Sequence, residues 1–304
     1  MVSFIAEQRG IHSVENICKI LPIAPSTYYE HAKRAENPGL LPVRAQRDAV
    51  LLELIEGVWE ESKRRYGSRK VWHALLKGSK KTGRKPVKVA RCTVERLMRA
   101  HGLQGVSRGR RRVFTTSSSE AQDKPLDLVE RNFTPGAPNK LWVADLTYVR
   151  TLIGFVYVAF VTDAFAKRIV GWQVSSSMTA RLVLDALQQA LHEREIGTGL
   201  VHHSDHGVQY LSIAYSEALL DAGIAASVGS KGDAFDNALA ETINGLYKTE
   251  VINHLGPWRG LADVERATME WVHWFNTERS YENLGYKSPA EYEMAYHQGS
   301  QAAA

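Results

Sequence analysis

Apolar residues recur at helical spacing through the first third of the chain. Residues 14–34 predict a short helix, a break at Pro22 and a second helix that opens at Pro25 or Ser26, where proline suits the first turn. After a connector rich in Pro and Gly at 36–45, three more amphipathic segments follow. The pattern therefore predicts a small helix-turn-helix-like segment at 1–45 and a basic three-helix domain of helix-turn-helix type at 46–105.

The pattern changes in the second half. Residues 106–138 are polar, contain proline and show no periodicity, which is typical of a linker. Two nearly continuous apolar runs at 141–149 and 155–165, and a third at 167–175, predict adjacent strands covered on both faces.

The order of the next segments favours one fold. A helix, a strand, a helix, a short strand and another helix follow the three strands, which is the order of a ribonuclease H-like mixed sheet flanked by helices. We expect this core at 139–252 and a C-terminal helical extension at 253–304. The chain is thus predicted to be an α+β multidomain protein with helical domains first and the mixed α/β domain second.

Charge is distributed unevenly. From Lys63 to Arg112 the chain has 18 Lys and Arg against one acid, Glu95, a net charge of +17 within an overall +5. Solvated helical surfaces usually mix both signs, so a block of one sign indicates a phosphate-binding surface. The basic residues that we expect to contact DNA from this block and its flank are Lys80, Lys81, Arg84, Lys85, Arg91, Arg96, Arg99, Arg108, Arg110, Arg111 and Arg112.

Composition excludes several classes. No stretch approaches the roughly 18 apolar residues of a membrane span, and the N-terminus lacks the apolar core of a secretory signal. We therefore expect a cytoplasmic protein with no membrane partner. The two cysteines, Cys18 and Cys92, have no partners at zinc-ligand spacing and are expected to be thiols.

Two aspartates stand where ordinary strand residues would not. Asp145 interrupts the middle of the first apolar strand, where a lone charge is costly unless it is paired or holds a metal. Asp205 follows the fourth strand, at the edge where such sheets place their ligands. In the expected sheet these strands are neighbours, so the two carboxylates would meet. A strand-end capping role is a reasonable alternative for Asp205 alone.

A third acid lies on a helix with one polar face. At about 100° per residue, Asn237, Glu241, Asn244 and Lys248 share a narrow sector opposite the apolar residues. That face would look toward the two aspartates, with Lys248 and Asn237 placed to touch DNA. An ordinary amphipathic surface helix is the alternative that this segment leaves open.

A histidine cluster invites a metal interpretation of its own. Zinc at His202, His203 and His206 is disfavoured, because no further ligands sit at fitting spacing and neighbouring strand residues point to opposite faces. A positioning role for one histidine beside the substrate stays open.

Three segments together carry a resemblance. LWVADLTYV, HHSDHGVQY and DNALAETINGLYKTE resemble the D,D(35)E signature of transposases of the retroviral-integrase type, with 35 residues between Asp205 and Glu241 and Lys248 seven positions later. More narrowly, the chain is similar to second-frame products of the insertion-sequence-three family of bacterial transposases. VWHALL, ARCTVERLMRAHGL, WFNTERS and SPAEYE extend the likeness over nearly the whole chain. Departures from the family pattern fall at His206, Val208, Ser280 and Tyr281.

The resemblance implies a function. Asp145, Asp205 and Glu241 would be the catalytic metal ligands for two Mg²⁺ ions, with Mn²⁺ able to substitute, in DNA strand cleavage and strand transfer. The partners implied are double-stranded DNA, as terminal inverted repeats and as target, and a second copy of the chain on paired ends. Family members also commonly act fused to an upstream-frame helix-turn-helix protein. The alternatives are a structure-selective nuclease of the same fold and a domesticated or regulatory DNA-binding protein.

Overall fold

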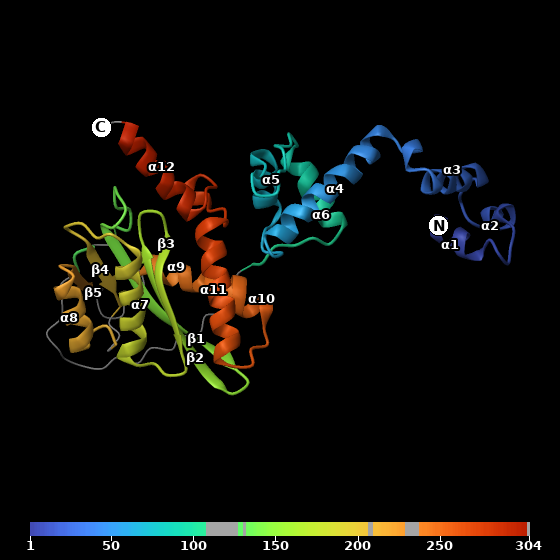
Figure 1. Cartoon of the computed structure of the whole chain (residues 1–304). Coiled ribbons are helices and arrows are strands. Elements are labelled where there is room, and N and C mark those ends of the chain that lie inside the picture. Colours follow the sequence, from blue (N-terminus) through green and yellow to red (C-terminus); the bar gives the residue numbers. More distant parts are fainter. Residues whose placement is uncertain (108–126, 130–131, 206–208, 229–236, 303–304) are drawn as a thin grey trace. The chain divides into compact units, whose positions relative to one another are not determined.

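The structure is a computed structural model of the 304-residue chain, and it describes residues 1–107, 127–129, 132–205, 209–228 and 237–302 (Figure 1). It divides into two compact units, Met1–Gln104 and Gly105–Ala304. The expected linker at 106–138 falls mostly outside the described residues. Arg108, Arg110, Arg111, Arg112, His206 and Val208 lie outside them as well.

The first unit begins with three short helices, α1 (Val2–Gln8), α2 (Val14–Ile20) and α3 (Pro25–Glu36). Pro25 occupies the first turn of α3, so the predicted break and restart are confirmed. The sequence pattern did not predict α1, whose buried Ile5 joins Ile17 and Tyr28 in a small core.

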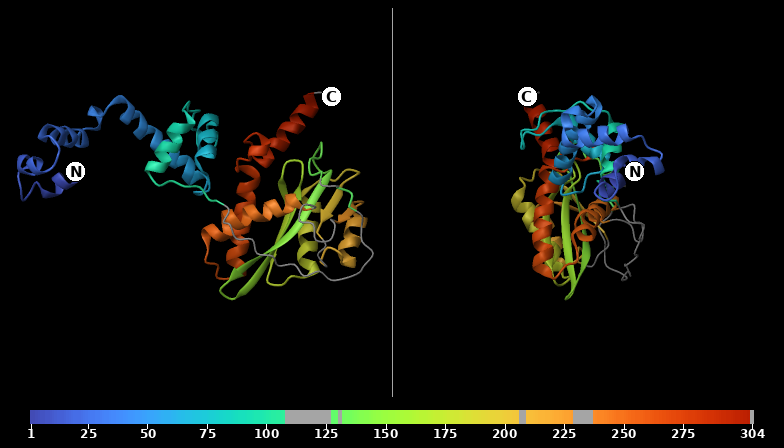
Figure 2. Two further views of the ribbon diagram at one scale, coloured as in Figure 1. Left: turned by 180° about the vertical axis from the view of Figure 1, so that it is seen from behind. Right: turned by 90° about the vertical axis from the view of Figure 1, so that its right-hand side faces the viewer.

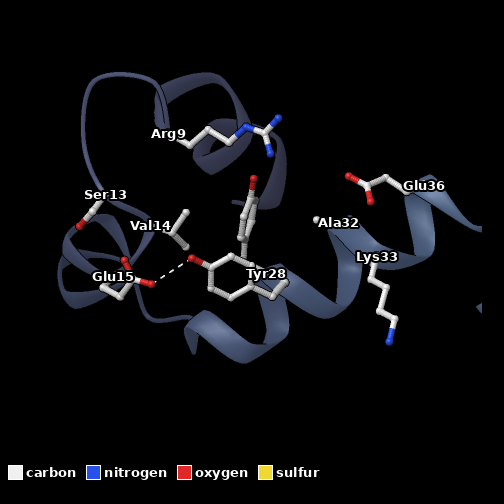
Figure 3. Close-up of a pocket in the computed structure, with 9 residues that line it drawn as sticks. Arg9, Ser13, Val14, Glu15, Tyr28, Ala32, Lys33 and Glu36 are labelled. Atoms are coloured by element: carbon white, nitrogen blue, oxygen red, sulfur yellow. Dashed lines mark hydrogen bonds between the residues drawn. The ribbon is translucent and has the colours of Figure 1, made fainter.

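Beside this core the hydroxyl of Tyr29 donates a hydrogen bond to Glu15 at 2.9 Å. Both residues line a shallow pocket of about 500 Å³ between α2 and α3 (Figure 3). The contact ties the two helices of the helix-turn-helix outline together at their surface.

Three longer helices form the basic part of this unit: α4 (Val43–Glu61), α5 (Ser68–Lys77) and α6 (Arg91–Ala100), preceded by the short turn η1 (Pro38–Leu40). All three longer helices were predicted. Their apolar faces meet through buried Ile55, Leu75 and Val94. The indole N–H of Trp72 on α5 donates to the carbonyl of Val89 at 2.8 Å, which fixes the chain just before α6.

The second unit contains a five-stranded sheet in the order β3-β2-β1-β4-β5. Its strands are β1 (Leu141–Thr151), β2 (Gly154–Asp163), β3 (Arg168–Ser175), β4 (Val201–Ser204) and β5 (Ala225–Val228). β2 pairs antiparallel with both β1 and β3, while β4 pairs parallel with both β1 and β5. The predicted mixed sheet is therefore confirmed.

Helices cover both faces of this sheet. α7 (Ala180–Glu193) and α8 (Ile213–Asp221) share one core with Trp142 and Ala144 of β1. On the other face α9 (Ala238–Tyr247) packs on Leu141 and Val143. α7 lies in front of the sheet in Figure 1, and α9 lies in front in the view from behind in Figure 2.

The approach of α7 to the sheet depends on a glycine. A Cβ added at Gly171 of β3 would lie 2.1 Å from the carbonyl oxygen of Ala186. Any other residue would push the helix away from the strand.

The C-terminal part is helical, as predicted. It comprises η2 (Lys248–Ile252), α10 (Asn253–Leu255), α11 (Leu261–Thr277), η3 (Glu282–Leu284) and α12 (Pro289–Ala302). α11 joins the core through Trp271, whose ring lies 5.8 Å from that of Phe160 on β2. The side chain of Asn276 accepts from the N–H and donates to the carbonyl of Ile169, so it continues the sheet edge as a strand would.

Buried ion pairs hold these helices to the core. Glu293 of α12 accepts from Arg194 and from Arg168, and its side chain is only 4% exposed. Glu250 of η2 accepts from Arg279 and from the indole of Trp271. Among the described residues, no helix has the length and apolar character needed to span a bilayer.

Candidate functional site

The two aspartates lie on neighbouring parallel strands. β4 pairs with β1 from Leu141 to Ala144, and Asp145 and Asp205 each come directly after this paired stretch. Both side chains therefore stand at the same edge of the sheet, as predicted from the expected strand order.

Burial and charge act on Asp145 together. Burial, followed by the negative charge of Asp205, raises the pKa of Asp145 to about 8, although hydrogen bonds from Leu146 and Asn244 oppose the shift. Glu241 adds a smaller contribution of the same sign. Because each acid disfavours the ionised form of the other, this edge of the sheet favours a cation between them.

α9 supplies the third acid and two carboxamides. Burial, and then Asp205, raises the pKa of Glu241 in the first turn of α9. Asn237, directly before the helix, donates to the carbonyl of Ala144 at 3.1 Å. Asn244, one turn after Glu241, donates to Oδ2 of Asp145 at 2.8 Å. The predicted polar face of this helix thus meets β1, and Asn237 is buried within that contact instead of standing on the surface.

Lys248 lies where the helix changes its pitch. η2 is a π-helical turn that starts at Lys248, and such turns are often found at functional sites. The ammonium nitrogen lies 4.9 Å from the centre of the Tyr148 ring on β1. Burial lowers the pKa of Lys248, while the charge of Asp145 acts in the opposite direction. The ammonium group of Lys248 is therefore close enough to Asp145 for the carboxylate charge to affect its pKa.

The donor set suits a hard divalent cation, which prefers oxygen ligands. Besides the three carboxylates, three buried oxygens at this edge have no hydrogen-bond partner within the described residues: Tyr210 Oη, Asn237 Oδ1 and Asn244 Oδ1. In the described ranges no group of three His, Cys, Asp or Glu side chains is close enough to bind one ion. The charges of Asp205 and Glu241 nevertheless act on Asp145, and that of Asp205 acts on Glu241, because each raises the pKa of its neighbour.

Two of these residues were not recognised in the sequence as part of the site. Asn244 lay on the predicted polar face but received no role, because its contact with Asp145 joins positions 99 residues apart. Tyr210 is buried, and the charges of Asp145 and Asp205 add to the effect of burial that raises its pKa. The QY pair five residues after Asp205 was the available signal for Tyr210.

The histidines have structural partners. The ring of His202 pairs with the hydroxyl of Tyr215 at 2.9 Å, and that of His203 pairs with Ser227 at 2.9 Å. Burial, followed by the charge of His203, lowers the pKa of His202 to about 3. Both rings are therefore engaged in the core instead of at the carboxylates.

The basic unit presents its cations in two ways. On α6, Arg91 pairs with Glu95 and Arg96 pairs with Asp48 of α4, whereas Arg99 is exposed with no ion pair among the described residues. In the loop before α6, Lys80, Lys81 and Lys85 are exposed.

Arg84 differs from the other predicted loop contacts. Its side chain is 10% exposed and pairs with Glu61 of α4 at 2.6 Å. The backbone reverses nearby at Gly78, where φ is +71° and a Cβ would lie 2.6 Å from the carbonyl oxygen of Arg84. Arg84 thus anchors the loop that displays the three lysines.

Comparison with known proteins accounts for both units. The HTH-like domain family matches residues 45–111, and the Integrase core domain family matches 135–234 and, through a second description of that domain, 222–289. The transposase for insertion sequence element IS629 of Shigella sonnei is 50% identical over 297 residues, which cover 98% of this chain and 97% of that protein. A Mycobacterium tuberculosis protein named for insertion sequence element IS986/IS6110 is 51% identical over 282 residues, covering 91% and 97%.

This chain belongs to the insertion-sequence-three family of DDE transposases. It is therefore a DNA transposase, a polynucleotidyl transferase with a helix-turn-helix-like domain and an integrase core, and the transposase expected from the sequence is confirmed.

Two solved structures resemble part of the transposase. The catalytic core of HTLV-2 integrase in complex with magnesium is 18% identical, with a TM-score of 0.41, over 52% of this chain and 98% of that one. The catalytic core of BIV integrase is also 18% identical, with a TM-score of 0.43, over 54% and 99%.

Proposed function

We propose that this transposase cuts and joins DNA at the terminal inverted repeats of its element, using Asp145, Asp205 and Glu241 as ligands for two Mg²⁺ ions. The observation that carries the proposal is the electrostatic coupling of three acids: Asp205 and Glu241 raise the pKa of Asp145, and Asp205 raises the pKa of Glu241. A group of acids at a partly buried edge of a sheet is destabilising unless a cation compensates its charge.

The neighbouring residues would support this role. The carboxamide of Asn244 holds one oxygen of Asp145, and the N–H of Leu146 holds the other at 2.8 Å, so the carboxylate is oriented before any ligand arrives. When bound, divalent ions would activate the attacking oxygen and stabilise the leaving one. Lys248, close to the acids, would bind a phosphate beside the scissile bond.

The basic unit would hold the DNA ends. Lys80, Lys81 and Lys85 in the loop and Arg99 on α6 present exposed positive charge for phosphates, and α6 stands last in its three-helix domain, as a recognition helix does. Paired ends require at least two copies of the chain. We place this activity in the bacterial cytoplasm.

A cleavage assay tests the proposal. Labelled DNA that contains the element's terminal repeat is incubated with the full-length protein and Mg²⁺, with Ca²⁺ as the control that supports binding without chemistry. We expect cleavage in Mg²⁺ that is lost in Glu241→Gln, Asp145→Asn and Asp205→Asn, while each variant retains DNA binding. If Glu241→Gln cuts at the parent rate, the ligand assignment is wrong.

A further inference from the structure

A second pocket lies along β1, beyond Asp145 in the sequence. Its volume is about 480 Å³, within the usual range for small-ligand sites. One side is formed by the end of β1 from Tyr148 and by Leu152 directly after it, and the other comes from η2, α10 and the segment up to Trp258. We call it the β1–η2 pocket.

The pocket lies farther along the chain of β1 than Asp145, and none of the three acids lines it. Tyr148 is three residues beyond Asp145, about 10 Å along a strand. From Asp145 onward β1 pairs only with β2 among the described strands, so its other edge is open to η2. Lys248 lines the pocket over the Tyr148 ring, and the charge of Asp145 raises the pKa of this lysine against the effect of burial. A DNA strand that passed from Asp145 along β1 would therefore meet Lys248 and this pocket.

The lining combines positive charge with apolar and aromatic walls. Lys248 and Arg150 are its cations, and none of the described residues that line it is acidic. Arg150 is exposed, with no ion pair or hydrogen-bonded side-chain partner in the described part of the chain. Tyr148 and Ile252 supply partly exposed apolar surface, and Trp258, which is only 9% exposed, adds a small area beside them.

The walls are fixed in place. The indole N–H of Trp258 donates to the carbonyl of Ile252 at 3.0 Å, and the carbonyl of Trp258 accepts from Leu152 at 2.9 Å. Tyr148 packs edge to face against Phe155 of β2, with ring centres 5.6 Å apart. A wall that is already ordered loses little entropy when a flat ligand binds.

We propose that the β1–η2 pocket is a nucleotide subsite that holds one unpaired nucleotide of the DNA strand next to the scissile phosphate. Its phosphate lies between Lys248 and Arg150, and its base lies against Tyr148 and Trp258. Sites for single-stranded nucleic acid combine these two elements, a cationic track for the backbone and aromatic side chains for the bases. The proposal rests on the proposed function, because it takes DNA cleavage at the neighbouring acids as given.

Photocrosslinking tests the subsite. The full-length protein in Ca²⁺ is irradiated with a single-stranded oligothymidylate that carries one 5-iododeoxyuridine, and the crosslinked peptides are mapped. We expect a crosslink in a peptide that contains Tyr148 or Trp258, besides those in the basic first unit. Crosslinks only in the first unit would overturn the subsite.

Variants separate the phosphate contribution from the base contribution. Arg150→Ala should reduce the pocket crosslink about tenfold and leave first-unit crosslinks unchanged, which makes them an internal reference. Tyr148→Leu should also reduce the pocket crosslink about tenfold, whereas Tyr148→Phe, which keeps an aromatic ring, should crosslink as the parent does. Arg181→Ala removes an equal charge from a side chain that is 86% exposed on α7 and should have no effect. Equal crosslinking in the parent and in Arg150→Ala would contradict the proposal.

A competitor without bases distinguishes a site that binds a whole nucleotide from one that binds only the phosphate backbone. An oligomer of abasic sites with the same number of phosphates should displace first-unit crosslinks but leave most of the pocket crosslink. Equal displacement of both would overturn the role of the base. A pocket crosslink in a protein that fails to cut terminal-repeat DNA in Mg²⁺ would refute the proposed cleavage assignment and leave the nucleotide site standing.

Discussion

The Nδ2 atom of Asn244 lies 2.8 Å from Oδ2 of Asp145, so a carboxamide on α9 orients a carboxylate on β1. The same amide group lies 3.4 Å from the carbonyl of Leu146, and the Oδ1 atom of Asn244 is buried without a partner among the described residues. Asn244 therefore fixes Asp145 from the helix that also carries Glu241.

Removing this donor should weaken the metal site without abolishing it. We expect Asn244→Ala to raise the Mg²⁺ concentration for half-maximal cleavage by about 10- to 100-fold, the usual effect of removing a residue that orients a metal ligand. The measurement is a Mg²⁺ titration of cleavage. DNA binding in Ca²⁺ should stay at the parent level, and an unchanged Mg²⁺ midpoint would show that Asp145 needs no support from Asn244.

The three exposed loop lysines should control the salt dependence of DNA binding. Replacing Lys80, Lys81 and Lys85 with Ala should reduce the slope of log K against log salt by about 0.9 for each phosphate that the protein no longer neutralises. Arg84 is left in place, because its ion pair with Glu61 holds the loop. Binding to terminal-repeat DNA is measured between low and physiological salt. A slope equal to that of the parent would remove this loop from the DNA interface.

Local pattern was sufficient for most of the elements, although not for α1, and for the positions of the acids within them. The lone charge of Asp145 within an apolar strand, and the place of Asp205 after the next parallel strand, follow from periodicity and from the order of elements. The polar sector of α9 was visible for the same reason, since Asn244 does face Asp145. These features depend on residues that are neighbours along one strand or helix.

Tertiary contacts were beyond that pattern. Helical phase predicted Lys248 on the face of Glu241, but it could not show that the ammonium group lies over the Tyr148 ring of β1. Arg84 was one cation in a basic run until folding brought Glu61 to it from 23 positions away. Charge and periodicity indicate which basic residues could contact DNA. Tertiary ion pairs, which those patterns do not reveal, determine which of these side chains remain exposed.

Lys248 should matter for joining more than for metal binding. We expect Lys248→Ala to weaken end-specific complexes and strand joining about tenfold, while nonspecific cleavage in Mg²⁺ is partly retained, because a point charge positions the substrate without activating the nucleophile. Lys248→Arg keeps the charge over the Tyr148 ring and should recover most of the joining. The paired measurements are end binding in Ca²⁺ and joining in Mg²⁺. Parent values for Lys248→Ala in both would make it a solvated surface lysine.

The ion pairs of Glu293, which hold α12 to the core, should make the stability of the second unit depend on pH. Burial would raise the pKa of Glu293, but the hydrogen bonds and charges of Arg194 and Arg168 outweigh it and lower the pKa below the ordinary 4.5. A lowered folded-state pKa contributes stability above about pH 4.5, and this contribution is lost as pH falls through the folded value.

Arg194→Ala should therefore destabilise the second unit by about 3 kcal/mol at pH 7, because Asp163 loses its cation and Glu293 keeps only Arg168. The loss should shrink below about pH 4.5, where protonated Glu293 no longer needs a counter-charge. Urea unfolding followed by tryptophan fluorescence at several pH values measures both. Arg181→Ala, which removes an exposed partner of Asp185, should cost less than about 0.5 kcal/mol at every pH. If Arg194→Ala costs as much at pH 3.5 as at pH 7, the contact stabilises α12 by packing and not by charge.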